Sequence, residues 1–322
     1  MTPCDATLTL DAAAAIRWDV VVIGAGPAGS SAALRMARHG LRVLLVDRGT
    51  MPRGKLCGCC LSTAAVGELA RLDISADGGP LARAVPLRRI SVAAGGRVAP
   101  IDVSGGATLS REALDAGMVA AAVAAGCEWL PQTTALSIDE QTDGTEPWVS
   151  VAVRTSRDAG TATIECRRLL LATGLTDHVR FSREASPSTA RTVAARSRIG
   201  IGGVLPATAA TLPPGELLMA VTPVGYCGVV RLEDGRIDVA AAVDRHALSA
   251  SEPATVVRRI VSEACGSRTA AALDGLESVV MRATPALTRS APLVEGRHRL
   301  VLRVGDAAGY VEPFTGEGMG WA

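Results

Sequence analysis

A glycine-rich turn between two apolar runs places the strongest constraint on how this chain can fold. The run Asp19–Ile23 leads into a Gly-x-Gly-x-x-Gly turn at Gly24–Gly29, and a second apolar run, Val43–Val46, ends in Asp47. A strand, a tight turn, a helix and a second strand are the elements that this order predicts. The chain is therefore expected to contain a βαβ unit of the dinucleotide-binding type.

Each glycine of this turn has a physical role. Gly24 permits the sharp bend, Gly26 lets the backbone approach a pyrophosphate, and Gly29 lets the helix pack closely on the strand. Pro27 and Ala28 complete the turn at the helix N-terminus, where free N–H groups favour negative charge. We expect a dinucleotide pyrophosphate at this position.

Asp47 follows the second strand, where its carboxylate can accept hydrogen bonds from a ribose diol. Arg48 beside it could neutralise the 2′-phosphate of NADP, but the Asp47 carboxylate would repel that phosphate. These residues leave the choice between NAD(P) and FAD open.

Composition removes several classes of function. The formal net charge of +1 over 322 residues argues against a nucleic-acid partner. The longest apolar stretches fall well short of the roughly 20 residues of a membrane-spanning helix, so we expect a cytoplasmic protein without a transmembrane segment. Eight cysteines do not make a disulfide scaffold, and the four histidines show no ligand spacing, so no metal site is expected.

Residue patterns predict the order of elements along the chain. Residues 1–17 are expected to form a flexible leader. Helices are expected near Ser30–Arg38, Ser110–Gly126 and Pro253–Ala264. Strands are expected at Val149–Arg154, Arg168–Ala172, Thr192–Ile201, Glu216–Thr222, Cys227–Leu232, Ile237–Val243, Val279–Arg282 and Leu300–Val304, with residues 233–236 as a hairpin turn.

Motifs at both ends carry a resemblance to one protein family. The run Leu300–Val304 leads into Gly305-Asp306, and Lys55-Leu56-Cys57-Gly58-Cys59-Cys60-Leu61-Ser62 forms a cysteine-containing loop. With the first glycine turn, these residues resemble the FAD-binding superfamily of aromatic-ring hydroxylases, geranylgeranyl reductases and flavin-dependent halogenases. The resemblance covers nearly the whole chain after the leader, and it identifies the dinucleotide as FAD.

The resemblance implies roles for further residues. Asp306, after Gly305, would bind ribityl or ribose hydroxyls. Backbone groups of a later turn would approach the flavin pyrimidine, and its matching residues are Pro313, Gly316, Gly318 and Met319. Arg111 would lie near the FAD phosphates, and Lys55 and Cys57 would lie near the isoalloxazine.

The chain also departs from its relatives. Residues 172–180 keep the frame of the hydroxylase motif, including Gly174, but Thr173 stands where that motif has an acid. This departure puts direct use of NADPH in doubt, although NAD(P)H stays a possible transient donor. Cys59 and Cys60 replace two glycines of the reductase loop, and the tryptophan-halogenase Trp-x-Trp motif is missing.

Two side chains are candidates for catalysis. Cys57 would lie near the flavin, where a thiolate can act as acid, nucleophile or redox partner. His178 could shuttle a proton. The sequence ends at Ala322, where relatives begin a long helix, so we expect that a partner chain could complete that helix.

We expect an α/β protein in which a glutathione-reductase-type FAD domain (18–80, 107–180 and 295–322) is interleaved with an antiparallel-sheet substrate domain (81–106 and 181–294). The expected function is FAD-dependent oxidation or reduction of an apolar isoprenoid, lipid or polyketide-like molecule, by C=C reduction or monooxygenation. Two alternatives stay open. One is a non-catalytic or split flavin-binding protein, and the other is an NAD(P)-binding dehydrogenase.

Overall fold

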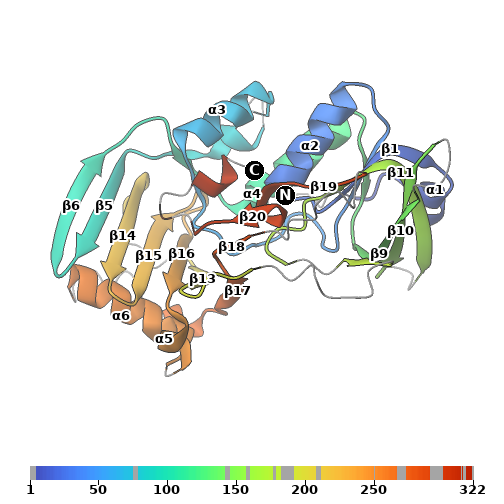
Figure 1. Ribbon diagram of the computed structural model, residues 1–322. Coiled ribbons are helices and arrows are strands. Elements are labelled where there is room, and N and C mark those ends of the chain that lie inside the picture. Colours follow the sequence, from blue (N-terminus) through green and yellow to red (C-terminus); the bar gives the residue numbers. More distant parts are fainter. Residues whose placement is uncertain are drawn as a thin grey trace.

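The computed structural model consists of two large β-sheets with helices packed against them (Figure 1). It describes residues 5–74, 79–141, 146–156, 160–176, 179–182, 192–207, 212–249, 251–266, 273–290, 300–312, 314 and 317–320. Among these residues, no helix is long and apolar enough to cross a membrane.

The first sheet has eight strands in the order β12-β9-β10-β11-β1-β2-β8, and β19 pairs with β11 off this path. The strands β1, β2, β8, β11 and β19 run parallel, whereas β10 is antiparallel to its neighbours β9 and β11. The bounds are β1 Arg17–Ile23, β2 Val43–Val46, β8 Glu128–Leu130, β9 Thr133–Gln141, β10 Trp148–Thr155, β11 Thr161–Leu171, β12 Arg180–Phe181 and β19 Val301–Arg303.

The parallel strands of this sheet are covered on both faces. Val20 and Val22 of β1 point to a core shared with α2 (Pro27–Arg38) and α4 (Arg111–Ala124). Val21 and Ile23 point to the opposite core, which α1 (Leu10–Ala14) closes. A parallel strand buried on both faces explains the continuous apolar sequence of β1.

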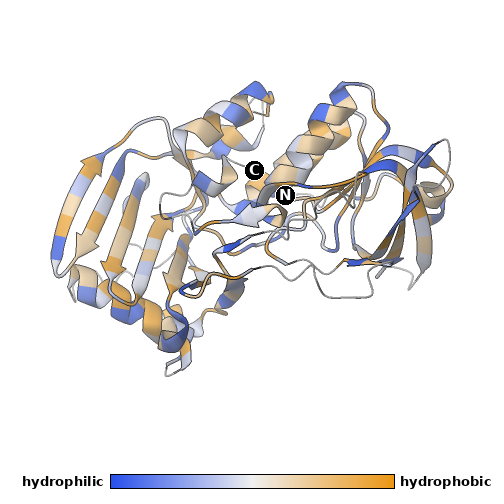
Figure 2. Ribbon diagram, in the orientation of Figure 1, coloured by the Kyte–Doolittle hydropathy of each residue, from blue (hydrophilic) through white to orange (hydrophobic). Residues whose placement is uncertain are grey.

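The second sheet has seven strands in the order β17-β13-β16-β15-β14-β5-β6, and it is antiparallel except where β14 meets β5. The helix α6 (Pro253–Cys265) packs on one face through its apolar stripe, which includes Val256, Val257 and Ile260. Figure 2 shows hydrophobic residues along the strands of both sheets, where these cores form. The bounds are β5 Arg89–Ala94, β6 Arg97–Asp102, β13 Ile199–Leu205, β14 Glu216–Thr222, β15 Gly225–Arg231, β16 Ile237–Val243 and β17 Arg282–Ala286.

Short elements connect the two sheets. Two small sheets have the orders β3-β7-β4 and β18-β20. Their strands are β3 Cys60–Leu61, β4 Val85–Pro86, β7 Ala107–Thr108, β18 Arg289–Ser290 and β20 Gly309–Tyr310. The remaining helices are α3 Thr63–Arg71, α5 Arg245–Ser249 and the short 3₁₀ turns Pro80–Arg83, Leu276–Ser278, Gly305–Ala307 and Glu317–Met319.

Most sequence predictions of this fold are confirmed. The α/β class, the opening βαβ unit and the helices α4 and α6 agree with expectation, and β14 and β16 have their predicted bounds. The domain boundaries stay a prediction.

Three predictions are wrong. The strand expected at 192–201 begins only at Ile199, since the residues before it form turns and an isolated bridge. The strand expected at 279–282 begins at Arg282, because residues 276–278 form a 3₁₀ turn. The flexible leader is wrong for residues 5–17, because α1 packs on the sheet with Ala13 fully buried and Thr7 donates its backbone N–H to the Trp129 carbonyl over 3.0 Å.

Candidate active site

A cavity of about 580 Å³ is lined by residues of both large sheets and of the loops between them. Segments far apart in the sequence line it: the turn between β1 and α2, the loop before β3, the start of α4, the end of β11 and one face of β14–β16. The volume lies in the range of small-molecule sites.

The glycine turn forms one end of this cavity. Gly24 has a φ of +110°, and a Cβ there would lie 2.3 Å from the Ala172 carbonyl oxygen. A Cβ at Gly29 would lie 1.8 Å from the Gly24 carbonyl oxygen, so this glycine allows close packing and does not itself line the cavity. At Gly26, by contrast, the nearest atom to an added Cβ is 3.8 Å away. The turn is therefore closely packed at Gly24 and Gly29, whereas space remains beside Gly26.

The open side of this turn suits an anion. The helix α2 begins at Pro27 with Gly26 as N-cap, and no described side chain caps its first N–H groups. The two atoms nearest a Cβ at Gly26 are Nη2 of Arg111 and, at 4.0 Å, Nζ of Lys55. Helix N–H groups and two cationic side chains fit the pyrophosphate of a dinucleotide.

The carboxylate of Asp47 is buried and fully hydrogen-bonded. It accepts from the backbone N–H of Ala25 at 2.7 Å and from that of Gly49 at 2.8 Å. Arg53 pairs with both of its oxygens, with Nη2 2.8 Å from Oδ2. Arg48, which the sequence suggested as a phosphate contact, also lines the cavity. Sequence reasoning missed Arg53, because its pairing with Asp47 depends on how the loop 48–54 folds back.

Arg111 reaches the cavity from the first turn of α4. Its guanidinium binds the Asp115 carboxylate through Nε at 2.8 Å and Nη2 at 2.7 Å, and both side chains are buried. The spacing of four residues places them on one face of the helix. The Asp115 carboxylate therefore fixes the orientation of the Arg111 charge.

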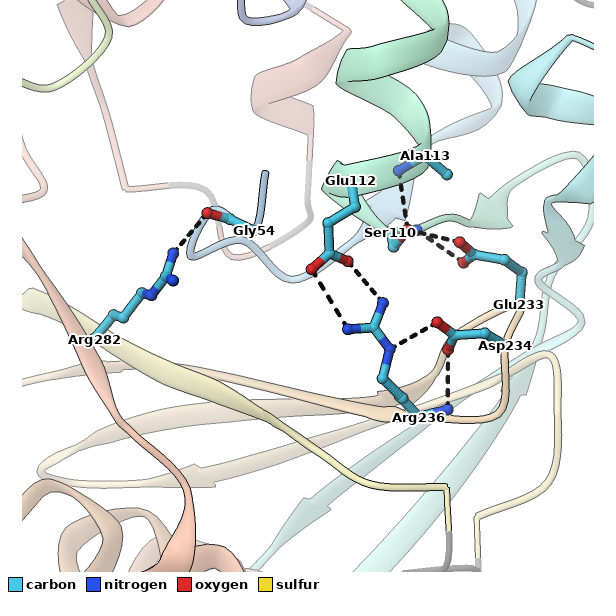
Figure 3. Close-up of polar contacts among 8 residues, drawn as sticks. All are labelled: Gly54, Ser110, Glu112, Ala113, Glu233, Asp234, Arg236 and Arg282. Atoms are coloured by element: carbon cyan, nitrogen blue, oxygen red, sulfur yellow. Dashed lines mark hydrogen bonds and ion pairs between the residues drawn. The ribbon is translucent and has the colours of Figure 1, made fainter. Parts of the chain in front are cut away.

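Contacts with the second sheet hold this end of α4 in place (Figure 3). Glu233 accepts hydrogen bonds from the backbone N–H and the hydroxyl of Ser110, the N-cap of α4. Arg236 binds Glu112 with Nη2 2.7 Å from Oε2. Arg282 donates to the Gly54 carbonyl at 2.6 Å, which ties the cysteine loop to β17.

Lys55 and Cys57 both line the cavity, and its surroundings shift both pKa values. Desolvation and then the charge of Arg111 lower the pKa of Lys55. Interaction with the neighbouring Cys59 thiol is the main cause that lowers the pKa of Cys57, despite the opposing effect of burial. Arg111 also lowers it, and both effects favour the thiolate form of Cys57.

The C-terminal motif reaches the same cavity in part. Asp306, Gly318 and Met319 line it, as does Gly174 from the loop after β11. Gly305 has a φ of +58° in the turn after β19 and does not line the cavity. His178, Pro313 and Gly316 lie outside the described residues.

The opposite wall is apolar and comes from the second sheet. Leu217, Met219, Gly228, Ala240 and Ala242 line it from β14, β15 and β16. Strand alternation turns these residues to the cavity and turns their neighbours to the core under α6.

Three aromatic side chains line the cavity. The chain has only two tyrosines and two phenylalanines, and both tyrosines and Phe314 line the cavity. The rings of Tyr226 and Phe314 meet edge to face with centroids 4.9 Å apart. Burial raises the pKa of Tyr226 and of Tyr310, so both hydroxyls stay protonated. Their low number in the sequence is a signal that could have identified these two tyrosines as site residues.

Comparison with known proteins finds similarity to oxidoreductases. The protein-family model for pyridine nucleotide-disulphide oxidoreductases matches residues 18–194, more than half of the chain. Menaquinone reductase of Mycobacterium tuberculosis is 34% identical over 162 residues, which are 48% of this chain and 37% of that protein. Digeranylgeranylglycerophospholipid reductase 3 of Methanosphaera stadtmanae is 32% identical over 142 residues, 39% of this chain and 32% of that protein.

The fold also has a solved counterpart. The myxobacterial chondrochloren halogenase, a FAD-dependent halogenase, superposes with a TM-score of 0.76 at 21% identity, covering 94% of this chain and 71% of the halogenase. The two curated reductases are each matched over about a third of their length. With the family model matching more than half of its residues, this chain belongs to the pyridine nucleotide-disulphide oxidoreductase family.

Proposed function

We propose that this oxidoreductase reduces a carbon–carbon double bond of an apolar, isoprenoid-type lipid. The observation that carries the proposal is that the dinucleotide cradle and the apolar face of β14–β16 line one cavity. A flavin bound at the cradle would share that cavity with an apolar substrate.

Several residues are proposed to hold FAD. Gly26, Pro27 and Ala28 would approach the pyrophosphate at the N-terminus of α2, with Lys55 and Arg111 nearby. Asp47, which two backbone N–H groups hold, would accept a ribose hydroxyl in place of a hydrogen bond from Arg53. Asp306, Gly318 and Met319 would contact the flavin end. When bound, FAD supplies a hydride, and NAD(P)H is the donor class that could renew it.

The shape of the apolar wall supports an elongated substrate. The middle of the wall is recessed, because its residues have little or no side chain: Gly228, Ala240 and Ala242. The larger side chains of Leu217 and Met219 lie beside this recess. Charged side chains gather at the opposite end, around Gly26. An apolar chain lying across the wall would keep water away from the reacting carbon atoms.

The two curated relatives favour reduction over monooxygenation. They are named as reductases of menaquinone and of digeranylgeranylglycerophospholipid, and both of these lipids carry isoprenoid chains. The cytoplasm is the proposed compartment, which the free cysteines of the described residues support.

Product analysis tests this function. FAD-loaded protein, photoreduced without oxygen by a sacrificial electron donor, is incubated with a geranylgeranyl lipid, and the lipid is analysed by mass spectrometry. The expected product gains two hydrogen atoms per double bond reduced. A product that gains one oxygen atom, and forms only in air, would instead establish monooxygenation.

A variant at Gly228 separates lipid binding from FAD binding. A Cβ at this position would lie 3.3 Å from Sδ of Met219, so the side chain of Gly228→Ile would fill the recess in the apolar wall. We expect it to lose lipid reduction while it keeps FAD. Gly67→Ala is the matched control, because an added Cβ there has no neighbour within 4 Å among the described residues, and it should keep both properties.

A further inference from the structure

One cationic side chain of the cavity comes from the sheet that forms the apolar wall. The described lysine and arginine side chains that line the cavity are Arg48, Arg53, Lys55, Arg111 and Arg282. Arg53 and Arg111 each pair with a carboxylate, and Lys55 lies beside Gly26. Arg282 belongs to β17 in the second sheet, and no carboxylate of the described residues pairs with it.

Cross-strand pairing places Arg282 in one row with the recess of the apolar wall. Gly202 of β13 pairs with Arg282 on one side and with Ala240 on the other. Ala240 in turn pairs with Gly228. Residues paired across strands point to the same face of a sheet, so Arg282 shares a face with the recess. Three strand spacings separate the Cα atoms of Arg282 and Gly228 by about 14 Å, and β17 is the edge strand.

The cavity continues from the recess to β17 past Leu56. This side chain lies over the neighbouring part of β13, while Gly200 lines the cavity beside it. Gly200 pairs with Ala242 of the recess and donates its backbone N–H to the Thr284 hydroxyl at 2.9 Å. That hydroxyl donates its single proton to a backbone carbonyl. Of the β17 side chains that line the cavity, Arg282 therefore keeps donors for a ligand.

The Arg282 guanidinium lies where the cavity opens, because the residue both lines the cavity and is exposed. Its Nη1 donates to the Gly54 carbonyl at 2.6 Å, and Figure 3 shows the side chain extending toward that carbonyl. A guanidinium has five N–H groups, and this bond uses one. The Glu112 carboxylate approaches the same glycine, but Arg236 binds it with Nη2 2.7 Å from Oε2.

We propose that Arg282 binds the phosphate of an isoprenoid lipid whose chain lies in the recess, and that it thereby selects anionic over uncharged lipids. The N–H groups not used at Gly54 would bind the phosphate oxygens, and the chain would run past Leu56 onto Ala240 and Gly228. The inference rests on the proposed reductase function and names the headgroup of its substrate. Arg282 is a specificity residue here, since it binds the headgroup and takes no part in the reduction.

A second phosphate site explains the distribution of charge in the cavity. The pyrophosphate expected at Gly26 has helix N–H groups, Arg111 and Lys55 beside it. By contrast, the described residues of β14–β16 that line the cavity are all uncharged. An uncharged lipid would need no cation at the end of this wall, whereas a phosphate placed there without one would lose its hydration uncompensated.

Lipid binding without turnover tests the proposal. Oxidised, FAD-loaded protein in a neutral detergent is titrated with geranylgeranyl phosphate and with geranylgeraniol, which has the same chain and no charge. The change in flavin fluorescence gives each Kd. The parent protein should bind the phosphate about tenfold more tightly than the alcohol. Added salt should reduce this preference, because Arg282 is exposed.

Variants at Arg282 separate its charge from its contact with the loop. Arg282→Gln keeps a donor for the Gly54 carbonyl, so it should keep FAD affinity and alcohol binding while it binds the phosphate about tenfold more weakly. Arg282→Lys keeps the charge and should retain most of the preference. Arg259→Gln is the matched control, since Arg259 is exposed on α6, which covers the other face of the sheet, and both affinities should stay unchanged.

Equal affinity of the parent protein for the two lipids overturns the proposal, as does an unchanged preference in Arg282→Gln. Either result leaves the reductase function to its own product analysis, whereas binding of neither lipid contradicts both proposals. Weaker FAD binding by Arg282→Gln would assign the residue to the cofactor instead. Neither NADPH nor inorganic phosphate should displace geranylgeranyl phosphate. Displacement by either one that requires Arg282 would assign the residue to that anion and overturn the proposal.

Discussion

Asp47 and Asp238 are buried to nearly the same extent, 5% and 4% exposed, yet the protein treats their carboxyl groups in opposite ways. Asp47, in the first sheet, receives two backbone N–H groups and the guanidinium of Arg53. Asp238, in the second sheet, lies between Val204 and Val230 of the neighbouring strands, and its Oδ2 has no hydrogen-bond partner among the described residues.

The difference shows how the surroundings decide the role of a buried acid. Hydrogen-bond donors around Asp47 suit a charged acceptor, which a ribose hydroxyl can bind. Apolar neighbours of Asp238 favour the neutral acid, which can donate a proton. One carboxyl therefore fits cofactor binding, whereas the surroundings of the other favour its neutral form.

Removing the Asp47 carboxyl should have the largest effect on FAD binding and on stability. Asp47→Ala deletes the ribose acceptor and leaves Arg53 without its partner. We expect about a hundredfold weaker FAD binding and a loss of about 2 kcal/mol in unfolding free energy. Flavin fluorescence and chemical denaturation measure the two quantities. Asp19→Asn, at an exposed pair with Arg42, is the control and should bind FAD normally. Normal FAD binding by Asp47→Ala would refute the assigned role.

A smaller effect is expected at the glycine turn that Asp47 supports. Gly26→Ala adds a Cβ on the open side of the turn, with no atom nearer than 3.8 Å among the described residues. Its stability should stay within about 0.5 kcal/mol, whereas FAD binding should weaken by about tenfold, since the methyl group keeps the pyrophosphate away from the backbone. Flavin titration of the variant gives the result, and unchanged affinity would place the pyrophosphate elsewhere.

Asp238 should respond in the opposite direction to Asp47. Asp238→Leu replaces a buried carboxyl, whose Oδ2 has no partner in the part of the chain that the structure describes, by an apolar side chain of similar size. We expect it to stabilise the protein by about 1 kcal/mol, measured by denaturation at pH 7. A destabilised Asp238→Leu variant would show that the carboxyl contributes net stability, and the comparison with Asp47 would then fail.

The smallest expected effect is the pH dependence of the stability that Asp238→Leu gains over the parent protein. Because burial raises the folded-state pKa of Asp238, its contribution is fully present below the unfolded-state pKa of about 3.9 and is lost as the pH rises through the folded-state value. The advantage of Asp238→Leu over the parent protein should therefore be larger at pH 8 than at pH 4. Denaturation at both pH values measures it, and a gain that shrinks with pH would mean that Asp238 folds as a carboxylate.

The glycine turn and Asp47 could be predicted from sequence because the geometry that brings them together is local. The turn Gly24–Gly29 and Asp47 are separated by one helix, and the backbone alone determines how they meet. Arg111 and Cys57 were found through family motifs. Arg53 could not be found in this way, because its pairing with Asp47 depends on how the loop 48–54 folds back. Tyr226 and Asp238 could not be found either, because they belong to strands of the second sheet, far from the glycine turn in sequence. Residues 5–17 were misjudged for the same reason, since tertiary packing orders α1.

The most direct test of the whole account is to mix photoreduced, FAD-loaded protein with a geranylgeranyl lipid in a stopped-flow instrument without oxygen. We predict that the flavin absorbance returns to that of the oxidised form, with one double bond reduced for each flavin reoxidised. A flavin that stays reduced with saturating lipid, and is reoxidised only when oxygen is admitted, would contradict the account.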